Sequence, residues 1–433
     1  MDQTSMAVLI LLGSFLLMIV LRFHICFSVA LSTALCMLYL DMPLITICQQ
    51  MVKAVNSFSL MAVPYFITMG AIMGAGGIGE KIVDLANALV GWMDGGLAMV
   101  NCLDSFFFGG ISGSAAADTA SLGSMLIPMM VEQGYDPDFA TAITITSSVE
   151  GILVPPSHNM VIYSTAAGGV SVGALFMAGY IPGAILCFSL MVGCFILCRV
   201  NNYPKGGKFN LVQAVKQIFR SFWALAAILI VVVGVAVGIF TATESAAIAV
   251  VYSLIVSLFI YKGVDLKGVW NVLTEAIDTL SIVLIVMATS GAFGYLLSYL
   301  KVPAMVANAI RGLTNNPIII ALLINVILLF LGCIMDMAPI ILITTPILLP
   351  LAMEIGISQV QFGIMMMLNC GIGLLTPPVG SVLFIGSAVA KRPMDKVVVA
   401  TLPFYLCMII TLMIITFVPA VTEFLPTLAG FAV

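Results

Sequence analysis

Two stretches of this chain, 222 residues apart, repeat one arrangement of prolines, glycines and a glutamate. The matched pairs at that spacing (350 − 128 = 222, 378 − 156 = 222) are Pro128 and Pro350, Glu132 and Glu354, Gly134 and Gly356, Pro155 and Pro377, Pro156 and Pro378, Gly110 and Gly332, and Gly151 and Gly373. So many matches in one register indicate an internal duplication. The chain is therefore expected to build one structural unit twice.

The duplication lies in a chain that is almost continuously apolar. Hydrophobic residues make up 62% of the sequence and charged residues 8%, and the mean hydropathy is +1.23. Stretches long enough to cross a bilayer therefore follow one another. No nucleotide-binding loop, zinc spacing or basic nucleic-acid-binding tract interrupts them. A duplicated unit in such a chain indicates a transporter built from two repeats around one central site.

The basic residues predict how the two repeats are oriented. Five of them crowd the polar connection 199–220, which the positive-inside rule places in the cytoplasm. Two further spans return the chain to Lys262 and Lys267, again inside. One span separates the N-terminus from Arg22, so the N-terminus is predicted to lie outside. The first repeat then begins outside and the second inside, and the two copies are predicted to be inverted.

The pattern predicts an all-α polytopic membrane protein with five segments. These are N-terminal scaffold helices at 1–42, a first repeat at 43–200, a cytoplasmic loop with a central helix pair at 201–269, a second repeat at 270–421 and a C-terminal tail at 422–433. Each repeat is expected to hold a re-entrant helical hairpin and a discontinuous helix. The hairpins are predicted at about 101–130 and 323–350, and the broken helices at about 139–167 and 364–388.

The segment 101–130 is too polar and too rich in glycine for a helix that faces lipid. Its centre runs from Gly109 to Ser114 and is followed by Asp118. Backbone that departs from a helix at membrane depth is tolerated only where protein covers it or where it lines a wet cavity. A hairpin that enters and leaves on one side, with its tip at 109–114, meets that condition.

Each broken helix is interrupted by two consecutive prolines, which remove backbone N–H donors. Unwound carbonyls there carry partial negative charge and attract a small cation such as sodium, with hydroxyl and carbonyl oxygens of the facing hairpin as further ligands. Two cation sites are therefore predicted. The first comprises Gly109, Ser112, Gly151, Val154 and Pro155, and the second comprises Gly332, Gly373, Thr376 and Val379. Helix packing is the alternative use of any one of these glycines.

No Lys or Arg is expected in the cores formed by the hairpin tips and helix breaks, because all fifteen lie at or near predicted helix ends or connections. An anionic substrate would be held by hairpin N–H groups, hydroxyls and the bound cations, which couples the binding of the two ligands. The predicted substrate contacts are Ser114, Ser157, His158, Asp336, Pro377 and Pro378. For Asp336 a structural N-cap remains an alternative, and for His158 a satisfied buried imidazole.

Three other acidic residues lie at membrane depth, where ionisable groups are functional candidates. Asp118 and Glu244 are interpreted as helix caps or buried hydrogen-bond partners. Glu150 directly precedes the first break, and its role is left open.

Four motifs in order resemble the large membrane subunit of the tripartite ATP-independent periplasmic (TRAP) transporters. They are Gly110-Ile-Ser-Gly-Ser-Ala-Ala-Ala-Asp-Thr-Ala, Val154-Pro-Pro-Ser157, Gly238-Ile-Phe-Thr-Ala-Thr-Glu-Ser-Ala-Ala and Leu375-Thr-Pro-Pro-Val-Gly380. The resemblance implies an elevator-type, sodium-driven importer of organic acids in the bacterial inner membrane, with a periplasmic N-terminus. It also implies two partners, a periplasmic substrate-binding protein and a separate small four-helix membrane subunit.

Matching motif positions assigns the same nine residues to two coupling sodium ions. Gly109 stands where some relatives have serine, so it would offer only a backbone carbonyl. The cargo stays open among dicarboxylates, sugar acids and keto acids.

Two alternative functions are kept. One is a stand-alone carboxylate carrier, coupled to sodium or protons, that needs no binding protein. The other is a rhomboid-like intramembrane serine protease, because Gly110-Ile-Ser-Gly113 is a Gly-x-Ser-Gly motif and His158 lies downstream of Ser112. That fold has no need for a second copy at 222 residues, and no enzymatic activity is expected.

Overall fold

The computed structural model describes residues 3–21 and 23–432, which form α-helices joined by short connections, with no β-strand in those ranges. The predicted all-α class is confirmed. Arg22, on which the predicted orientation of the first helix depends, lies outside the described residues.

Helices outside the two predicted repeats cover the flanks and the centre of the chain. They are α1 (Gln3–Val20), α2 (Ile25–Tyr39), α12 (Leu211–Arg220), α13 (Phe222–Ala236), α14 (Ala242–Ile255), which continues as a π-helical turn at Val256–Ile260, and α22 (Ala420–Leu428). A capping box begins α14: Thr241 and Glu244 satisfy each other's backbone N–H groups. Glu244 is therefore a helix cap, one of the two roles that the sequence left open.

The two repeats contain the same parts in the same order. The first has α3 (Ile45–Val55), α4 (Ala62–Ala75), α5 (Ile78–Val90), α6 (Gly96–Ser112), α7 (Ala115–Glu132), α8 (Pro137–Ser147), α9 (Glu150–Leu153), α10 (His158–Ala166) and α11 (Val172–Val200). The second has α15 (Leu266–Tyr299), α16 (Val302–Leu313), α17 (Pro317–Gly332), α18 (Met337–Glu354), α19 (Gln359–Gly373), α20 (Ser381–Ala390) and α21 (Met394–Phe417). Helices α6 and α7 pair through a two-residue turn, and α17 and α18 through a four-residue turn.

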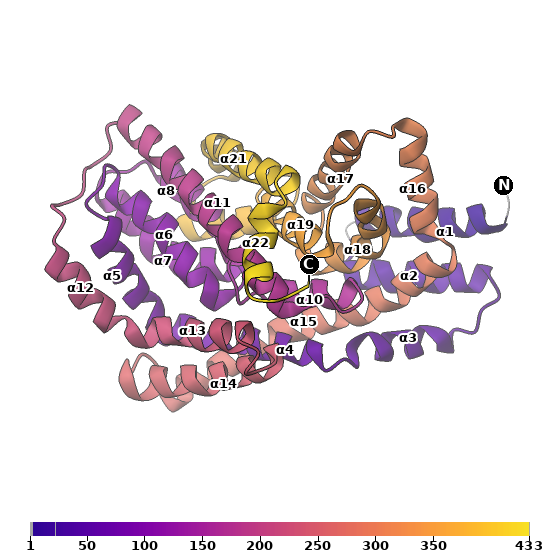
Figure 1. The fold of residues 1–433 in the computed structure, drawn as a ribbon, viewed down its shortest axis with the longest axis horizontal. Coiled ribbons are helices and arrows are strands. Elements are labelled where there is room, and N and C mark those ends of the chain that lie inside the picture. Colours follow the sequence, from indigo (N-terminus) through magenta and orange to yellow (C-terminus); the bar gives the residue numbers. More distant parts are fainter. Residues whose placement is uncertain (1–2, 22, 433) are drawn as a thin grey trace.

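Equivalent helices lie at opposite ends of the molecule. The amphipathic helices α5 and α16 occupy the same place in the order of the repeats, and Figure 1 shows them at the two ends of the long axis. Two copies that are inverted relative to each other are compatible with this placement.

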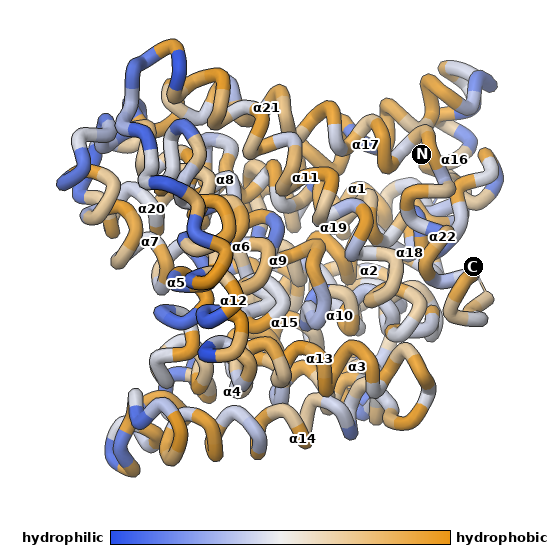
Figure 2. Tube along the Cα trace, turned by 60° about the vertical axis from the view of Figure 1, so that its left-hand side comes forward, coloured by the Kyte–Doolittle hydropathy of each residue, from blue (hydrophilic) through white to orange (hydrophobic). Residues whose placement is uncertain are grey.

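Among the described residues, six helices are long and apolar enough to cross a membrane, and two bent pairs, α4 with α5 and α12 with α13, raise the number to eight if each pair is one span. The hairpin and broken helices are mostly shorter and add to these spans. Figure 2 shows hydrophobic residues along most of the helices and hydrophilic ones gathered at the connections near α5 and α12. This distribution suits a polytopic membrane protein.

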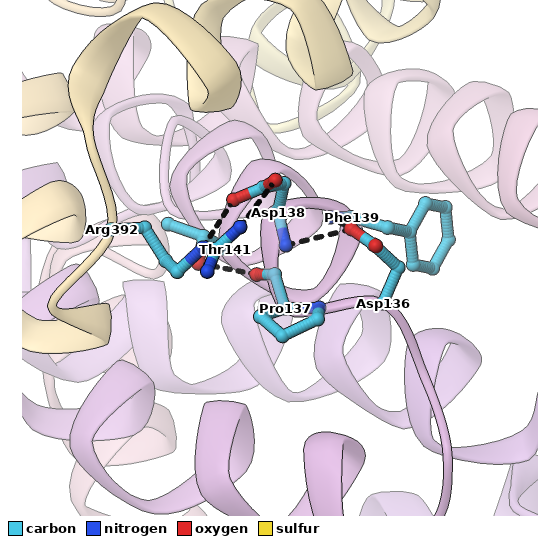
Figure 3. Close-up of polar contacts among 6 residues, drawn as sticks. All are labelled: Asp136, Pro137, Asp138, Phe139, Thr141 and Arg392. Atoms are coloured by element: carbon cyan, nitrogen blue, oxygen red, sulfur yellow. Dashed lines mark hydrogen bonds and ion pairs between the residues drawn. The ribbon is translucent and has the colours of Figure 1, made fainter.

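The second half of each broken helix packs on the hairpin of the other repeat. Helix α10 packs against α18, and α20 packs against α7 and α8. An ion pair extends the second of these contacts: Nε and Nη2 of Arg392, just after α20, donate to the two carboxylate oxygens of Asp138 at the start of α8, at 2.6 and 2.9 Å (Figure 3). The hairpins and broken helices of both repeats therefore form one interlocked unit.

Candidate functional site

The first hairpin and the first break touch through two glycines. A methyl group on Gly109 of α6 would lie 2.5 Å from the Cα of Gly151 in α9, closer than any side chain tolerates. Gly113 ends α6 with a positive φ of 60° and faces the carbonyl of Pro156 in the break. The predicted tip and the predicted break are therefore in direct contact.

The second hairpin meets the second break in the same way. A methyl group on Gly332 would lie 2.9 Å from the Cα of Gly373, and the N–H of Val379 donates to the carbonyl of Cys333 at 3.0 Å. Gly109, not Gly110, is thus the counterpart of Gly332 in these contacts (332 − 109 = 223). The sequence register of 222 was off by one here because α6 continues for three residues beyond Gly109, whereas α17 ends at Gly332.

Buried amides tie each hairpin to the first half of its broken helix. Asn101 of α6 donates to Thr144 and accepts from Ser147 in α8. In the second repeat Asn369 of α19 donates to Asn325 of α17 at 2.7 Å. Buried polar side chains that are hydrogen-bonded hold helices in one register, so each hairpin and its break are positioned as a pair.

Oxygen atoms of the first predicted cation site converge on Gly151. An atom at the Cβ position of Gly151 would lie 3.7 Å from both Ser112 Oγ and Asp118 Oδ2. The carbonyl of Gly109 already accepts from Gly113 at 2.9 Å, and the carbonyl of Pro155 lies within 3.4 Å of the Tyr180 hydroxyl that donates to it.

Asp118 fits a cation better than the structural role that the sequence favoured. It is fully buried, and neither carboxylate oxygen has a hydrogen-bond partner among the described residues. A buried ionised carboxylate without a partner costs several kcal/mol, so a carboxyl group in this position is either protonated or accompanied by a cation. The first site therefore offers a charged ligand beside the predicted hydroxyl and carbonyls, and these residues suit a hard cation such as sodium.

Asp104 and Glu150 share this condition: both are fully buried and have no hydrogen-bond partner in the part of the chain that the structure describes. Sequence reasoning did not select Asp104, although an acidic residue inside an apolar hairpin was a usable signal. Among the described residues, no group of three or more His, Cys, Asp or Glu side chains is arranged to hold a metal ion. Backbone carbonyls and hydroxyls would have to complete any cation site.

The second predicted site is built from backbone and one hydroxyl. Thr376 Oγ1 donates to the carbonyl of Ile372 at 2.8 Å, and the Tyr405 hydroxyl donates to the carbonyl of Leu375 at 2.6 Å. The carbonyl of Gly373 accepts from the N–H of Thr376. Val379 is 43% exposed, so this site opens to the surface.

A cavity of about 570 Å³ lies where both hairpin tips meet both broken helices. We refer to it as the central cavity. Four helices begin at its wall, α7 at Ser114–Ala116, α10 at His158–Asn159, α18 at Asp336–Pro339 and α20 at Ser381–Val382. The first turns of α2 and residues 282–286 of α15 close the opposite side. No Lys or Arg lines the cavity among the described residues.

Three of the six predicted substrate contacts line the central cavity, and three do not. Ser114, His158 and Asp336 are part of its wall. Ser157 is buried outside it, and Pro377 and Pro378 face the surface beside the second break. These three stay predictions that the structure does not bring to the cavity wall, because a sequence does not tell which side of an unwound segment faces a cavity.

Asp336 occupies the N-cap position of α18 but makes no capping hydrogen bond through its side chain, and it is exposed. Its carboxylate is therefore free to face the cavity. The Nδ1 atom of His158 is buried without a hydrogen-bond partner in the described structure, which disfavours a satisfied core imidazole.

A serine protease pair is absent from the described residues. The Ser112 hydroxyl contacts only the backbone of Ser114, at 3.4 Å, and His158 makes no hydrogen bond to it. The motif Gly110-Ile-Ser-Gly113 instead forms the last turn of α6 and its end.

Comparisons with known proteins agree with this geometry. Residues 12–421 match the family described as "Tripartite ATP-independent periplasmic transporter, DctM component". The chain is 36% identical to the 2,3-diketo-L-gulonate TRAP transporter large permease protein of Escherichia coli K12, covering 96% of this chain and 97% of that protein. It is 38% identical to the C4-dicarboxylate TRAP transporter large permease protein of Pseudomonas aeruginosa, covering 86% and 87%.

A solved structure shares the fold at low sequence identity. The YdaH transporter of Alcanivorax borkumensis superimposes with a TM-score of 0.61 over 86% of this chain and 88% of that one, at 14% identity. That likeness concerns the fold alone.

Proposed function

The chain belongs to the DctM component family of the tripartite ATP-independent periplasmic transporters, and we propose that it is the permease for sodium-coupled import of an organic acid. Members of this family are membrane permease subunits and not enzymes. The proposed localisation is the bacterial inner membrane, with the N-terminus on the periplasmic side.

The observation that carries the proposal is the set of four helix N-termini at the central cavity. Each N-terminus presents unpaired N–H groups and about half a unit of positive charge. Four of them around a cavity without Lys or Arg favour a carboxylate, which they bind without a cationic side chain. A cavity of about 570 Å³ has room for a small organic acid.

Sodium coupling follows from charge balance beside that cavity. Asp118 adds a buried negative charge next to Gly151, and Ile152 of the same short helix lines the cavity. A cation bound there would offset both Asp118 and the incoming carboxylate, so each ligand would favour the other. The second site would act in the same way through Thr376 and the carbonyl of Gly373.

An elevator mechanism agrees with how the helices pack. The hairpins and broken helices of the two repeats interlock through α10 on α18 and α20 on α7. Helix α15 packs against α18 of this unit, and α2 and α3 pack on α15. These three helices would form the fixed scaffold. The proposed motion slides the interlocked unit, with both cation sites and the central cavity, along α15.

The proposed partners are a periplasmic substrate-binding protein and a small four-helix membrane subunit, as the family description implies. The relatives' names include 2,3-diketo-L-gulonate and C4-dicarboxylates. Both are organic acids, and the cargo of this chain is proposed to be one of that class.

Reconstitution of the chain with its small subunit and binding protein tests the proposal. Proteoliposomes would be offered labelled succinate or labelled 2,3-diketo-L-gulonate with an inward sodium gradient. Uptake of at least one acid is expected, with loss of nearly all uptake when choline replaces sodium. Uptake at full rate in choline without a proton gradient would contradict sodium coupling. Uptake without the binding protein would favour the stand-alone carrier.

A further inference from the structure

A second cavity, of about 400 Å³, lies further along α15 and is separate from the predicted sites. We call it the α3–α15 cavity. Its polar wall residues are Gln50, Lys53, Ser57, Thr165, Ser290, Tyr295 and Ser298. Leu342 and Pro346 of the second hairpin close it on the side of the interlocked unit. It therefore lies between the flanking helices and the unit that holds the central cavity.

Two of its polar groups, the buried Ser290 hydroxyl and the exposed Lys53 amine, have no hydrogen-bond or ion-pair partner among the described residues. The Ser290 side chain is 1% exposed, and its hydroxyl makes no hydrogen bond to any described residue. Lys53 forms no ion pair or side-chain hydrogen bond with the described part of the chain. Helices α3 and α15 cross closely beside these residues, because a methyl group on Gly291 would lie 2.2 Å from the Cβ of Ala54. Lys53 directly precedes Ala54 in the sequence, and Ser290 directly precedes Gly291.

The charge of the cavity is positive. Lys53 is its one charged residue among the described residues, and no Asp or Glu lines it. A buried hydroxyl that lacks a partner costs free energy unless a ligand or water satisfies it. A carboxylate accepts from a hydroxyl and from an ammonium group at the same time.

The position of the cavity connects it to the central cavity. Residues 282–286 of α15 line the central cavity, and residues 287–298 line the α3–α15 cavity. The midpoints of these two segments are separated by roughly 13 Å along the helix at 1.5 Å per residue. Helix α18 also lines both, through residues 336–339 and then Leu342 and Pro346.

We propose that the α3–α15 cavity is a second anion site, at which Lys53 and the Ser290 hydroxyl hold a carboxylate of the cargo on its path to or from the central cavity. The proposal rests on the proposed function, because an organic acid must be the cargo. The alternative is that Lys53 only favours the C-terminal end of α3, where a cation interacts well with the helix dipole.

Thiol chemistry tests the site without any transport. In the full chain reconstituted in phosphatidylcholine, Ser290→Cys would be combined with serine at Cys26, Cys48, Cys333 and Cys407, the cysteines that are not buried. Modification by an anionic reagent, 2-sulfonatoethyl methanethiosulfonate, would be compared with a cationic one, 2-(trimethylammonium)ethyl methanethiosulfonate. Each rate would be normalised to the same reagent's rate with free cysteine.

The normalised rates are expected to favour the anionic reagent about fivefold, because Lys53 attracts it. Lys53→Gln should bring the ratio to about 1, and Lys53→Arg should keep it. Lys301→Gln is the matched control: it lies two residues beyond α15, outside the cavity, and should change nothing. A ratio that Lys53→Gln leaves unchanged, or a cysteine that reacts with neither reagent, would overturn the proposal.

Protection identifies the occupant. Succinate at 10 mM should slow the modification about threefold with Lys53 present and have no effect in Lys53→Gln. Protection by phosphatidylglycerol in the bilayer but not by succinate would assign the site to lipid headgroups and overturn the proposal. Failure of the proposed function would appear as absent uptake of both labelled acids, a separate measurement that leaves the anion preference of Ser290→Cys unaffected.

Discussion

The two halves of the site share a backbone arrangement and differ in chemistry. In each, a glycine of the hairpin touches a glycine of the broken helix, Gly109 with Gly151 and Gly332 with Gly373. Around the first contact lie three buried carboxylates, Asp104, Asp118 and Glu150. The equivalent positions of the second half hold apolar residues: Ile327 (104 + 223), Ile340 (118 + 222) and Ile372 (150 + 222). The duplication preserved the packing, and at these three positions only the first copy carries buried carboxyl side chains.

The halves also differ in exposure. Residues 151–157 of the first break are all buried, whereas Pro377, Pro378 and Val379 of the second are exposed. Helix α11 covers the first break, with Tyr180 bonded to the carbonyl of Pro155. A cation at the first site would thus be shielded from solvent. Its attraction to a carboxylate is stronger there than it would be near water. For the same reason, Asp118 attracts a cation more strongly in the buried first half than a carboxylate would in the exposed second half.

The largest effect should come from disturbing the close glycine–glycine contact that both halves share. Gly109→Ala and Gly373→Ala each place a methyl group 2.5 Å from backbone of the facing glycine. Both should reduce sodium-driven uptake to below about 1% of the parent and lower the free energy of unfolding by about 1–3 kcal/mol. Gly312→Ala, where no atom lies within 4 Å of the added methyl group, should behave like the parent. Normal uptake by one of the two variants would show that close contact matters in one half only.

Removing the charge should affect the first half alone. Asp118→Asn keeps the size of the side chain and removes the ligand charge, and it should raise the sodium concentration for half-maximal uptake about 50-fold. The matched control is Ile340→Val at the equivalent position, which shortens a buried apolar side chain by one carbon and removes no charge. It should lower the melting temperature slightly and leave the sodium dependence unchanged. Equal sodium dependence in Asp118→Asn and parent would remove Asp118 from the site.

A smaller effect should come from the Thr376 hydroxyl, which has no counterpart at the equivalent position of the first half. Thr376 corresponds to Val154 of the first half (376 − 154 = 222). Thr376→Val should raise the sodium concentration for half-maximal uptake about fivefold, because one neutral oxygen ligand is worth about 1 kcal/mol. The reciprocal variant Val154→Thr is the control and should leave sodium dependence within about twofold. An unchanged value in Thr376→Val would exclude its hydroxyl as a ligand.

The smallest effect concerns ion pairs at the edges of the two halves. Arg199 and Lys205 hold the pKa of Asp94 below its usual range by donating hydrogen bonds at 2.9 and 3.2 Å. Because the folded-state pKa is the lower one, the stabilisation is present above the unfolded-state pKa of about 3.9 and is lost as pH falls through the folded-state value. Thermal unfolding should separate parent from Asp94→Asn most clearly at pH 7, and the difference should shrink as the pH falls below about 4.

An ion pair of the second half provides the comparison for this thermal-unfolding measurement. Arg311 and Glu354 form an ion pair in which both side chains are 47% exposed. An exposed pair contributes little, so Arg311→Gln should shift the melting temperature less than Asp94→Asn does at pH 7. A larger shift for Arg311→Gln would reverse the ranking of the two edges.

Much of the site was predictable because its signals are local in the sequence. Glycines, hydroxyls and paired prolines inside apolar segments mark the places where helices must stop, and these include Gly109, Gly151, Gly332 and Gly373. The sequence could not predict the packing of α10 on α18, since the hydrophobic pattern of a helix does not show which other helix it packs against. It also missed that Asp118 lacks a hydrogen-bond partner, because partners come from tertiary structure.

The paired glycines also decide how movement in this protein is best measured. With no side chain between α6 and α9, or between α17 and α19, there is no compressible layer that would let them shift independently. Spin labels placed elsewhere on α6 and α9, or on α17 and α19, away from the paired glycines, would therefore report the same distance change relative to α15. Gly312 and Gly13, where an added side chain meets open space, are suitable reference positions for such a molecular ruler.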